Sequence, residues 1–347
     1  MMKTFILSLS FAISALATSR MTAPSGSLVV AKSGGTYSTV RTKELHKYEE
    51  LASNTTQISA AVAALSKTST STQTIFIEEG TYDEQVYIPS LAGELIIYGQ
   101  TEDTSSYSSN LVTLTYGLSA TEAGSDDLSA TLRNYAAKSR VYNINIENSY
   151  GSGAQALALS AYATDQGYYA CQFIGYQDTV LAETGNQVYA KSYIEGAIDF
   201  IFGQHATAWF DDCDIGVVAR SVGTITANGR SSSSDASYYV INNSNIAAAS
   251  GQTVASGSYY LGRPWSEYAR VVFQYTSMSN VINSAGWEEW SSSEPNTEDV
   301  LFGEYDNSGA GSEGTRASFA TKLSAAIEIT AILGDDYADW VDTTYLS

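Results

Sequence analysis

Short stretches in which apolar and polar residues alternate recur along the middle of the chain. They are rich in β-branched and aromatic residues, and Gly, Asn and Ser separate them. Alternation with a period of two is typical of β-strands, because successive side chains of a strand point to opposite faces. The pattern therefore predicts strands at 141–146, 168–173, 188–194, 210–215, 239–246 and from 271 onward.

A fixed spacing relates these stretches to one another. Two sets of residues repeat at a step of 21 positions: Phe173, Ile194 and Ile215 in one, and Cys171, Ser192 and Cys213 in the other. A constant period of this length is typical of a solenoid in which each repeat forms one coil. Because helical patterns are few nearby, the sequence predicts an all-β fold, a single-stranded right-handed parallel β-helix. Two packed β-sandwich domains are the alternative.

Apolar residues at helical spacing bracket the strands, at 58–65 and at 319–332 before Gly334. The terminal strands of a solenoid have unpaired edges, which natural proteins cover. Short capping helices are therefore predicted at both ends.

The two cysteines are predicted to stay free. Cys171 and Cys213 lie two coils apart, and two strand spacings are about 9.6 Å. A disulfide needs Cα atoms within about 7 Å of each other. Both side chains are therefore expected to pack inside the β-helix as small apolar groups.

The charge balance narrows the possible partners. The chain has 17 Lys and Arg against 37 Asp and Glu, a formal net charge of −20. Such a surface does not attract nucleic acid, whose binding rests on neutralising phosphates. With 44% hydrophobic and 16% charged residues, the chain is also not disordered through excess charge.

The first residues predict secretion. Lys3 precedes an apolar run from Phe5 to Leu16, and Ala15-Leu16-Ala17 offers the small residues of a signal-peptide cleavage site. No later apolar run is long enough to span a membrane. We therefore expect a signal peptide at 1–17, one domain at 18–347, an extracellular location and no membrane partner.

Many common catalytic patterns are missing from the sequence. It contains two histidines, His46 and His205, and no G-x-S-x-G, H-E-x-x-H, C-x-x-C or P-loop pattern. The usual Ser-His-Asp hydrolases and the common metal and nucleotide sites are therefore not indicated.

Four polar residues fall into the register of the solenoid. Gln155 and Gln177 are 22 positions apart, and Asp178 and Asp199 are 21 apart. One coil of separation places residues on adjacent strands, about 4.8 Å apart. Two stacked carboxylates do not both ionise readily, so one should have a raised pKa and serve as an acid.

Such a carboxylate pair suits two chemistries. One aspartate can attack a carbonyl carbon while the other protonates the leaving alcohol. Alternatively, the pair can cleave a glycosidic bond with retention. The neighbouring glutamine amides favour the first chemistry, because they can donate hydrogen bonds to an oxyanion. A purely structural ladder of Asp and Gln side chains is the non-catalytic interpretation.

Seven short motifs occur in the order found in one family. They are Gly80-Thr81-Tyr82-Asp83-Glu84, Gln155-Ala156-Leu157-Ala158-Leu159, Gly175-Tyr176-Gln177-Asp178-Thr179, Asp199-Phe200-Ile201-Phe202-Gly203, Leu261-Gly262-Arg263-Pro264-Trp265, Gly286-Trp287 and Phe302-Gly303-Glu304-Tyr305. From about Gly26 to the C-terminus the chain resembles the pectin methylesterases of the secreted fungal type. The resemblance implies a parallel β-helix that hydrolyses the methyl esters of galacturonate in pectin without a metal or other cofactor.

Carried over residue by residue, the resemblance assigns catalytic roles. It implies Asp199 as nucleophile, Asp178 as acid and then base, and Gln155 and Gln177 as the oxyanion site. Arg263 would hold Asp199 ionised and oriented.

Spacing alone does not place Arg263. It lies 64 residues beyond Asp199, about three coils, so it should reach the site from another face or after a long excursion.

Aromatic residues within these motifs are expected to contact the sugar. The resemblance assigns the walls of the cleft to Trp265 and Trp287, and Tyr176 and Phe202 are expected to contribute. The expected partner is methyl-esterified homogalacturonan, and the enzyme is expected to be a monomer. A pectin-cleaving β-helix glycosidase and a non-catalytic carbohydrate-binding solenoid are the alternatives.

Two departures from the family pattern stand out. Residues 40–57 interrupt a strand-to-helix connection that the family makes directly, and 6 of the 17 residues from Arg41 to Gln57 are charged. We interpret 40–57 as absent from the working protein, as in a translated unspliced intron; a surface insertion is the alternative. Ser160 stands where the family often has a basic residue, which predicts an altered subsite.

Two sequons offer sites for N-glycosylation, at Asn54 and at Asn242. Asn54 lies within the doubtful segment, so Asn242 is the stronger candidate.

Overall fold

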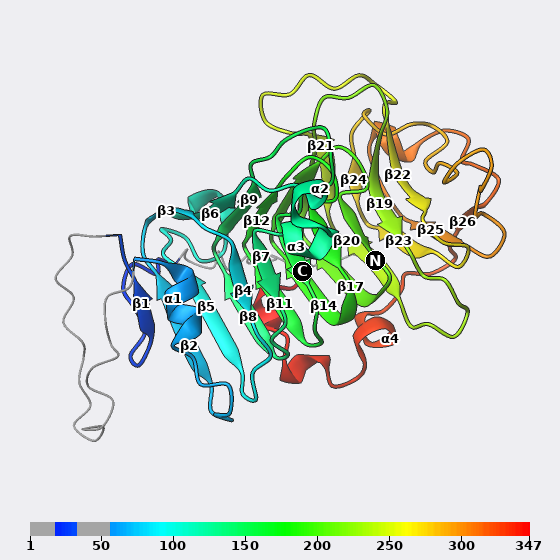
Figure 1. Cartoon of the computed structure of the whole chain (residues 1–347). Coiled ribbons are helices and arrows are strands. Elements are labelled where there is room, and N and C mark those ends of the chain that lie inside the picture. Colours follow the sequence, from blue (N-terminus) through cyan, green and yellow to red (C-terminus); the bar gives the residue numbers. More distant parts are fainter. Residues whose placement is uncertain (1–17, 33–55) are drawn as a thin grey trace, which may run out of the picture.

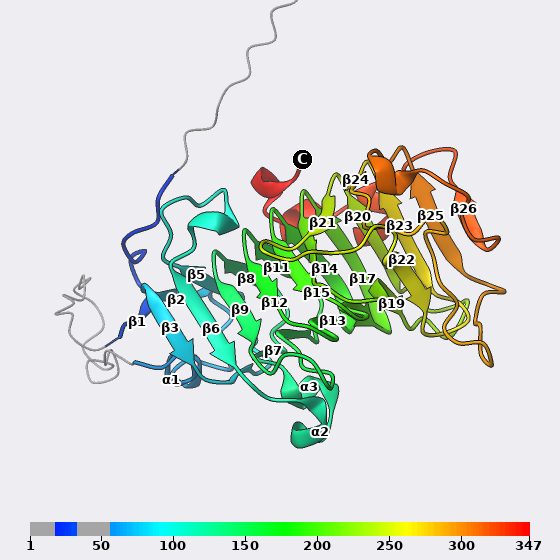
Figure 2. The same ribbon diagram turned by 90° about the horizontal axis from the view of Figure 1, so that it is seen from above.

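The computed structural model describes residues 18–32 and 56–347, and in this part the chain winds into a parallel β-helix (Figures 1 and 2). Three parallel sheets run along its length. Each of the central coils contributes one strand to each sheet, so strands of successive coils lie side by side. The predicted signal peptide, most of the 40–57 segment, His46 and Asn54 lie outside the described residues.

The largest sheet of the described residues has eleven strands. They are β1 (Leu28–Val30), β2 (Gln73–Ile77), β5 (Leu95–Gly99), β8 (Ser139–Tyr142), β11 (Gln166–Tyr169), β14 (Thr184–Ala190), β17 (His205–Asp211), β20 (Tyr238–Asn242), β23 (Arg270–Gln274), β25 (Leu301–Tyr305) and β26 (Ala320–Lys322).

A second sheet has eight strands and follows the first around each coil. They are β3 (Gly80–Asp83), β6 (Val112–Tyr116), β9 (Asn145–Asn148), β12 (Gln172–Ile174), β15 (Tyr193–Gly196), β18 (Asp214–Val217), β21 (Asn245–Ala248) and β24 (Ser277–Met278).

The third sheet has seven strands and carries the candidate site described below. They are β4 (Val86–Ile88), β7 (Leu132–Asn134), β10 (Leu159–Ala161), β13 (Val180–Ala182), β16 (Ile201–Gly203), β19 (Gly223–Asn228) and β22 (Tyr259–Pro264).

Short helices interrupt or flank the coils. The α-helices are α1 (Ile58–Ala63), α2 (Ala120–Ala123), α3 (Asp126–Ser129) and α4 (Ile329–Leu333). Single 3₁₀ turns occur at Tyr107–Ser109, Ala310–Ser312, Tyr337–Asp339 and Thr343–Tyr345. No helix in the part of the chain that the structure describes has the length and apolar character needed to cross a bilayer.

The structure confirms the 21-residue repeat for the coils in which the sequence showed it. Phe173 pairs with Ile194, and Ile194 pairs with Ile215, on three adjacent strands of the eight-stranded sheet. All three side chains are buried inside the coils, where each contributes about 1.5–3 kcal/mol through burial of apolar surface. Cys171 and Cys213 are buried free thiols, as the spacing predicts.

Each predicted strand from 141 to 246 turns out to be two strands joined by a sharp corner. The corner residue has a left-handed backbone with φ between 45° and 56°, as at Asn143, Ala170, Lys191, Asp212 and Asn243. Each of these corners has two residues. Inward-facing residues are three positions apart across a corner, as at Tyr168 and Cys171, and two apart along a strand, as at Cys171 and Phe173. The run of alternating residues is therefore shifted by only one position at the corner, which is why the sequence pattern did not reveal it.

The N-terminal cap is confirmed, but the C-terminal one is not. In α1, Ile58, Ala61 and Val62 are buried against the first coils. The range 319–332 instead forms β26, a loop and α4, which packs against β17 on the outer face of the eleven-stranded sheet. From there the tail runs back along the molecule, as the red segment of Figure 1 shows.

Apolar side chains on that outer face explain the path of the tail. Tyr142, Tyr169 and Trp209 point outward from the sheet, and Leu333 and Tyr345 of the tail pack over them in one cluster. Covering these large side chains removes apolar surface from water, which stabilises this path of the tail.

Asn242 lies on the same face. Its amide donates to Asp211 and accepts from Gln274, at 2.5 and 2.9 Å. Attachment of a glycan there would replace one of the two hydrogens on the amide nitrogen that donates to Asp211.

Candidate active site

Asp178 and Asp199 lie at equivalent positions of adjacent coils. Each comes just before a strand of the seven-stranded sheet, Asp178 before β13 and Asp199 before β16. Gln177 forms a parallel bridge with Ile198, and the backbone N–H of Asp178 donates to the Ile198 carbonyl at 3.0 Å. The predicted stacking of the two aspartates is therefore present in the structure.

Both aspartates have a left-handed backbone, with φ of 63° at Asp178 and 48° at Asp199. Aspartate tolerates this conformation better than most residues, although it is still uncommon. The corners between the other two sheets have the same conformation, so it marks a turn of the coil and does not by itself indicate a function.

Asp199 is firmly held by two neighbouring strands. Nε and a terminal nitrogen of Arg263 donate to its two carboxylate oxygens at 3.0 and 2.6 Å. The Thr224 hydroxyl donates to Oδ1 at 2.6 Å. Asp199 is only 6% exposed, so this carboxylate is both ion-paired and fixed in orientation.

Arg263 reaches Asp199 by a shorter route than its spacing suggested. It lies on β22, which is two strands beyond β16 in the same sheet. The intervening coils carry long loops, so 64 residues correspond to two coils and not three. Of the two expected routes, another face or a long excursion, the structure shows the second, because long loops add to the 21-residue step.

Asp178 is in a different electrostatic environment. Burial raises its pKa well above the usual range, the negative charges of Asp199 and Asp126 add to this, and Arg263 opposes it. Its carboxyl group is 7% exposed and has no hydrogen-bond partner among the described residues. The pair thus combines an ion-paired carboxylate with one that favours the protonated form.

The two glutamines lie where the sequence predicted. Gln177 precedes Asp178, and Gln155 lies one coil earlier, where the Ala156 N–H donates to the Gln177 carbonyl at 3.1 Å. Both residues are partly exposed, and no residue in the described ranges hydrogen-bonds their side-chain amides. Both amides are therefore free to donate to a bound group.

Aromatic and apolar side chains form a surface beside the pair. Phe202 of β16 packs with Trp265, their ring centroids 6.2 Å apart, and Leu181 and Ala227 extend this cluster. Tyr176, adjacent to Gln177, is partly exposed.

The structure corrects the expectation for Trp287. Its ring is 1% exposed and stacks on Phe302 in the core, with centroids 4.2 Å apart. A sugar ring therefore has no access to its face.

Trp290, which the sequence analysis missed, takes the outer position instead. The guanidinium of Arg263 lies over its ring, 4.4 Å from the centroid. Its position three residues after Trp287 was the available signal.

Ser160, where the sequence predicts an altered subsite, has a side chain that is already engaged. It is fully buried, and its hydroxyl donates to Asp127 of α3 at 2.8 Å. Ser160 thus anchors the α2–α3 excursion to β10. This excursion brings Asp126 into the electrostatic environment of Asp178, which the strand pattern gave no means of foreseeing.

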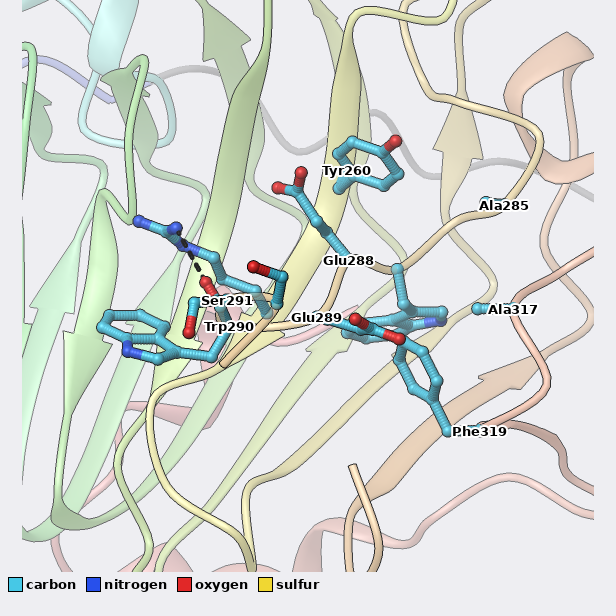
Figure 3. Close-up of a pocket in the computed structure, with 11 residues that line it drawn as sticks. Tyr260, Ala285, Glu288, Glu289, Trp290, Ser291, Ala317 and Phe319 are labelled. Atoms are coloured by element: carbon cyan, nitrogen blue, oxygen red, sulfur yellow. Dashed lines mark hydrogen bonds between the residues drawn. The ribbon is translucent and has the colours of Figure 1, made fainter. Parts of the chain in front are cut away.

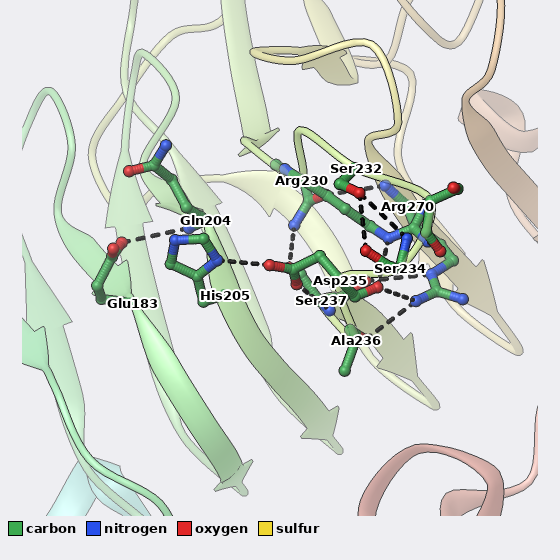
Figure 4. Close-up of polar contacts among 12 residues, drawn as sticks. Glu183, Gln204, His205, Arg230, Ser232, Ser234, Asp235, Ala236, Ser237 and Arg270 are labelled. Atoms are coloured by element: carbon green, nitrogen blue, oxygen red, sulfur yellow. Dashed lines mark hydrogen bonds and ion pairs between the residues drawn. The ribbon is translucent and has the colours of Figure 1, made fainter.

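A second polar cluster lies at the other end of the same strands (Figure 4). His205 and Asp235 form an ion pair at 2.6 Å, and Arg230 donates to the backbone carbonyls of Ser233 and Asp235. Burial alone would raise the pKa of Asp235, but the Ser237 N–H and His205 hold it below its usual value. These contacts attach the loop after β19 to β17, and none of them involves Asp178 or Asp199.

Thr224 is the clearest residue of the site that the sequence did not indicate. Its hydroxyl accepts the Asp199 backbone N–H at 3.1 Å and donates to the carboxylate. Thr224 lies 25 residues after Asp199 and not 21, so the repeat did not place it next to Asp199.

We expect Thr224→Val to lower kcat about tenfold with little change in KM, since the carboxylate loses one of its three anchoring hydrogen bonds. Thr224→Ser should restore most of the rate. Steady-state kinetics with a thermal melt of each variant would check this. Equal losses in the Val and Ser variants would contradict a role for the hydroxyl.

A pair of catalytic carboxylates beside an aromatic surface is typical of hydrolases that act on carbohydrates. Comparison with known proteins specifies the family. A family model described as pectinesterase matches residues 48–325, and the chain belongs to the pectinesterase family. Among the described residues, no group of His, Cys, Asp and Glu is arranged to hold a metal ion.

Individual relatives agree over nearly the whole length. A pectinesterase of Aspergillus aculeatus is 63% identical over 348 residues, covering 99% of this chain and 100% of that protein. A pectinesterase of Aspergillus niger is 61% identical, covering 100% of both.

Solved structures give the same result. A pectin methylesterase of Aspergillus niger superposes with a TM-score of 0.84 at 43% identity, covering 94% of this chain and 100% of the other. The carrot enzyme gives 0.79 at 26% identity, covering 94% and 98%. The predicted fold class and the predicted activity, hydrolysis of pectin methyl esters, are confirmed, and the glycosidase and the non-catalytic solenoid are not favoured.

Proposed function

We propose that Asp199 and Asp178 carry out the ester hydrolysis through an acyl-enzyme. The observation that carries this proposal is the asymmetry of the pair: Asp199 is held by Arg263, while burial keeps the pKa of Asp178 raised. A nucleophile must be ionised and an acid must be protonated at the same pH, and these two environments provide both states.

In the first half of the reaction, an Asp199 oxygen attacks the C6 carbonyl carbon of a methylated galacturonate. Gln155 and Gln177 donate hydrogen bonds to the oxyanion that forms. The carbon–oxygen bond to the methoxy group then breaks as Asp178 transfers its proton to that oxygen. Methanol leaves, and an anhydride joins Asp199 to the sugar.

In the second half, ionised Asp178 accepts a proton from a water molecule that attacks the same carbonyl carbon. The bond to Asp199 breaks, which returns the Asp199 carboxylate and leaves a free galacturonate. Asp178 ends the cycle protonated, so the pair regains its starting state.

The substrate of this reaction is methyl-esterified homogalacturonan. Trp265, Phe202 and Tyr176 would contact the sugar units next to the reacting one, with Trp290 in place of the buried Trp287. A solved pectin methylesterase of 23% identity is in complex with a hexasaccharide, which agrees with an oligosaccharide substrate.

The location and assembly of the protein are proposals of the same kind. We propose that the chain is secreted after removal of 1–17, acts as a monomer on plant cell-wall pectin, and works without residues 40–57. The names of its Aspergillus relatives agree with an extracellular substrate.

A direct test measures methanol release and polymer viscosity together. We expect methanol to be released with no early fall in viscosity, since the esters are cleaved and the glycosidic bonds are not. A rapid fall in viscosity would favour a depolymerase.

Replacing Gln177 by alanine tests the oxyanion site. We expect kcat to fall about 10²-fold or more with KM nearly unchanged, because the hydrogen bond forms fully only with the charged intermediate. Gln155→Ala should act similarly. A change in KM alone would assign the glutamines to substrate binding.

A further inference from the structure

A pocket of about 420 Å³ opens beside the carboxylate pair (Figure 3). Arg263, which binds Asp199, and Trp290, which packs on Arg263, both line this pocket. Tyr260 and Glu288 line it farther from the carboxylate pair. Its volume lies within the range of small-molecule sites.

The pocket lies on the same row of the sheet as the reacting carboxylate. The Asp199 N–H donates to the Thr224 carbonyl at 2.8 Å, and Thr224 pairs with Tyr260 on the next strand. Tyr260 is thus two strand spacings from Asp199, about 9.6 Å along the axis of the β-helix. A polymer whose reacting unit sits at Asp199 can therefore place a neighbouring unit in this pocket.

Glu288 gives the pocket its charge. Its backbone N–H donates to Gly262, which fixes the residue beside β22, and Figure 3 shows its carboxylate next to the Tyr260 ring. The side chain is partly buried, and its carboxylate has no hydrogen bond or ion pair within 18–32 and 56–347. Burial raises its pKa, nearby Arg263 lowers it, and the charge of Asp199 raises it again.

Arg263 does not neutralise this carboxylate. Two of its nitrogens are engaged by Asp199 and a third donates to the Trp290 carbonyl at 3.5 Å. The charge of Arg263 is therefore balanced by Asp199, and Glu289 at the rim adds a further negative charge. A free carboxylate placed in the pocket would be repelled by this net negative charge, whereas an uncharged methyl ester would not be repelled.

We propose that this pocket is a sugar subsite in which Glu288 selects a methyl-esterified galacturonate and rejects a free one. The inference rests on the proposed function. Discrimination arises mainly from repulsion of the wrong unit, which is an efficient source of specificity where the two units differ by one charge. The enzyme would then work best in regions where the neighbouring unit still carries its ester.

The test compares two homogalacturonans of equal length, one of high and one of low methyl-ester content. For each enzyme the measured quantity is the ratio of kcat/KM per ester on the two substrates, at an ionic strength that screens distant charges. Wild type should favour the highly esterified polymer. We expect Glu288→Gln to reduce this ratio about fivefold, since the repulsion across the pocket is removed.

Glu298→Gln is the matched control. Glu298 is an exposed residue of the same loop outside the pocket, and its substitution changes the net charge equally. It should leave the wild-type ratio in place. Should Glu288→Gln prove unstable in a thermal melt, Glu288→Ser provides the same loss of charge with a smaller side chain.

The outcomes separate the subsite from the mechanism. The subsite proposal is overturned if the Glu288 variants keep the wild-type ratio of kcat/KM values. It is also overturned if Glu298→Gln lowers this ratio as much as Glu288→Gln does. Full activity of an Asp199→Asn variant overturns the proposed mechanism instead. An inactive Asp199 variant together with a reduced ratio in Glu288→Gln alone supports both.

Discussion

Replacing Asp199 by asparagine is expected to lower the rate of methanol release by about 10⁴-fold or more, since no acyl-enzyme can form. Asparagine keeps the shape of the side chain and tolerates the left-handed backbone of φ 48°. The measurement is kcat with methylated pectin, accompanied by a thermal melt. Loss of activity without loss of folding would identify a chemical role.

Asp165→Asn is the control for this substitution. Asp165 has a similar left-handed backbone, with φ 59°, and hydrogen-bonds to the neighbouring Thr164 outside the site. Its variant should keep wild-type activity. If Asp199→Asn retained more than a few per cent of the wild-type rate, the nucleophile would have to be another residue.

The second large effect is expected at Asp178. Asparagine there can neither give nor accept the proton, so we expect kcat to fall about 10²- to 10⁴-fold. In the wild type, activity should decline on the alkaline side as Asp178 loses its proton. Its raised pKa moves this decline to higher pH than an ordinary aspartate would give.

The same variant should be more stable than the wild type at neutral pH. Below the usual pKa of aspartate, Asp178 is protonated in both the folded and the unfolded chain, and its ionisation has no effect. As the pH rises, the unfolded chain ionises first, so the folded state loses stability until its own raised pKa is passed.

The difference in Tm between Asp178→Asn and wild type should therefore grow as the pH rises from about 4, until the raised pKa of Asp178 in the folded protein is passed. Thermal melts across this range measure it. A constant difference would show that Asp178 titrates normally in the folded protein, and near-wild-type turnover would remove Asp178 from its role as acid.

The sequence revealed the fold because the coils that carry Asp178 and Asp199 have no loops. Identical corners at Ala170, Lys191 and Asp212 keep those coils at 21 residues, and the repeat was visible there. The next corner, Asn243, comes 31 residues later because a long loop follows β19. Insertions in the loops outside a coil leave the packing inside it unchanged, but they make the spacing between equivalent residues irregular. The repeat is then no longer visible in the sequence.

For the same reason, only some residues of the site could be predicted from the sequence. The aspartates and glutamines lie on regular coils and were placed by spacing. Arg263 and Trp290 lie beyond long loops, and Thr224 follows Asp199 by 25 residues and not by 21. Only the family resemblance therefore indicated Arg263, and no pattern indicated Thr224 or Trp290. Trp287 was misplaced because burial depends on which face of a strand-like segment points inward, and a two-residue motif does not settle that.

The C-terminal tail changes how this repeat protein holds together. A solenoid is stabilised mainly by contacts between neighbouring coils, so it can fray from its ends one coil at a time. Here Tyr345 packs on Tyr142 and Tyr169, and the backbone N–H of Ser347 donates to Asp211 at 2.6 Å. One segment thereby links the coils of β8, β11 and β17. Opening any of these coils disturbs the tail that the others share, so we expect the central coils, which carry the catalytic pair, to unfold together.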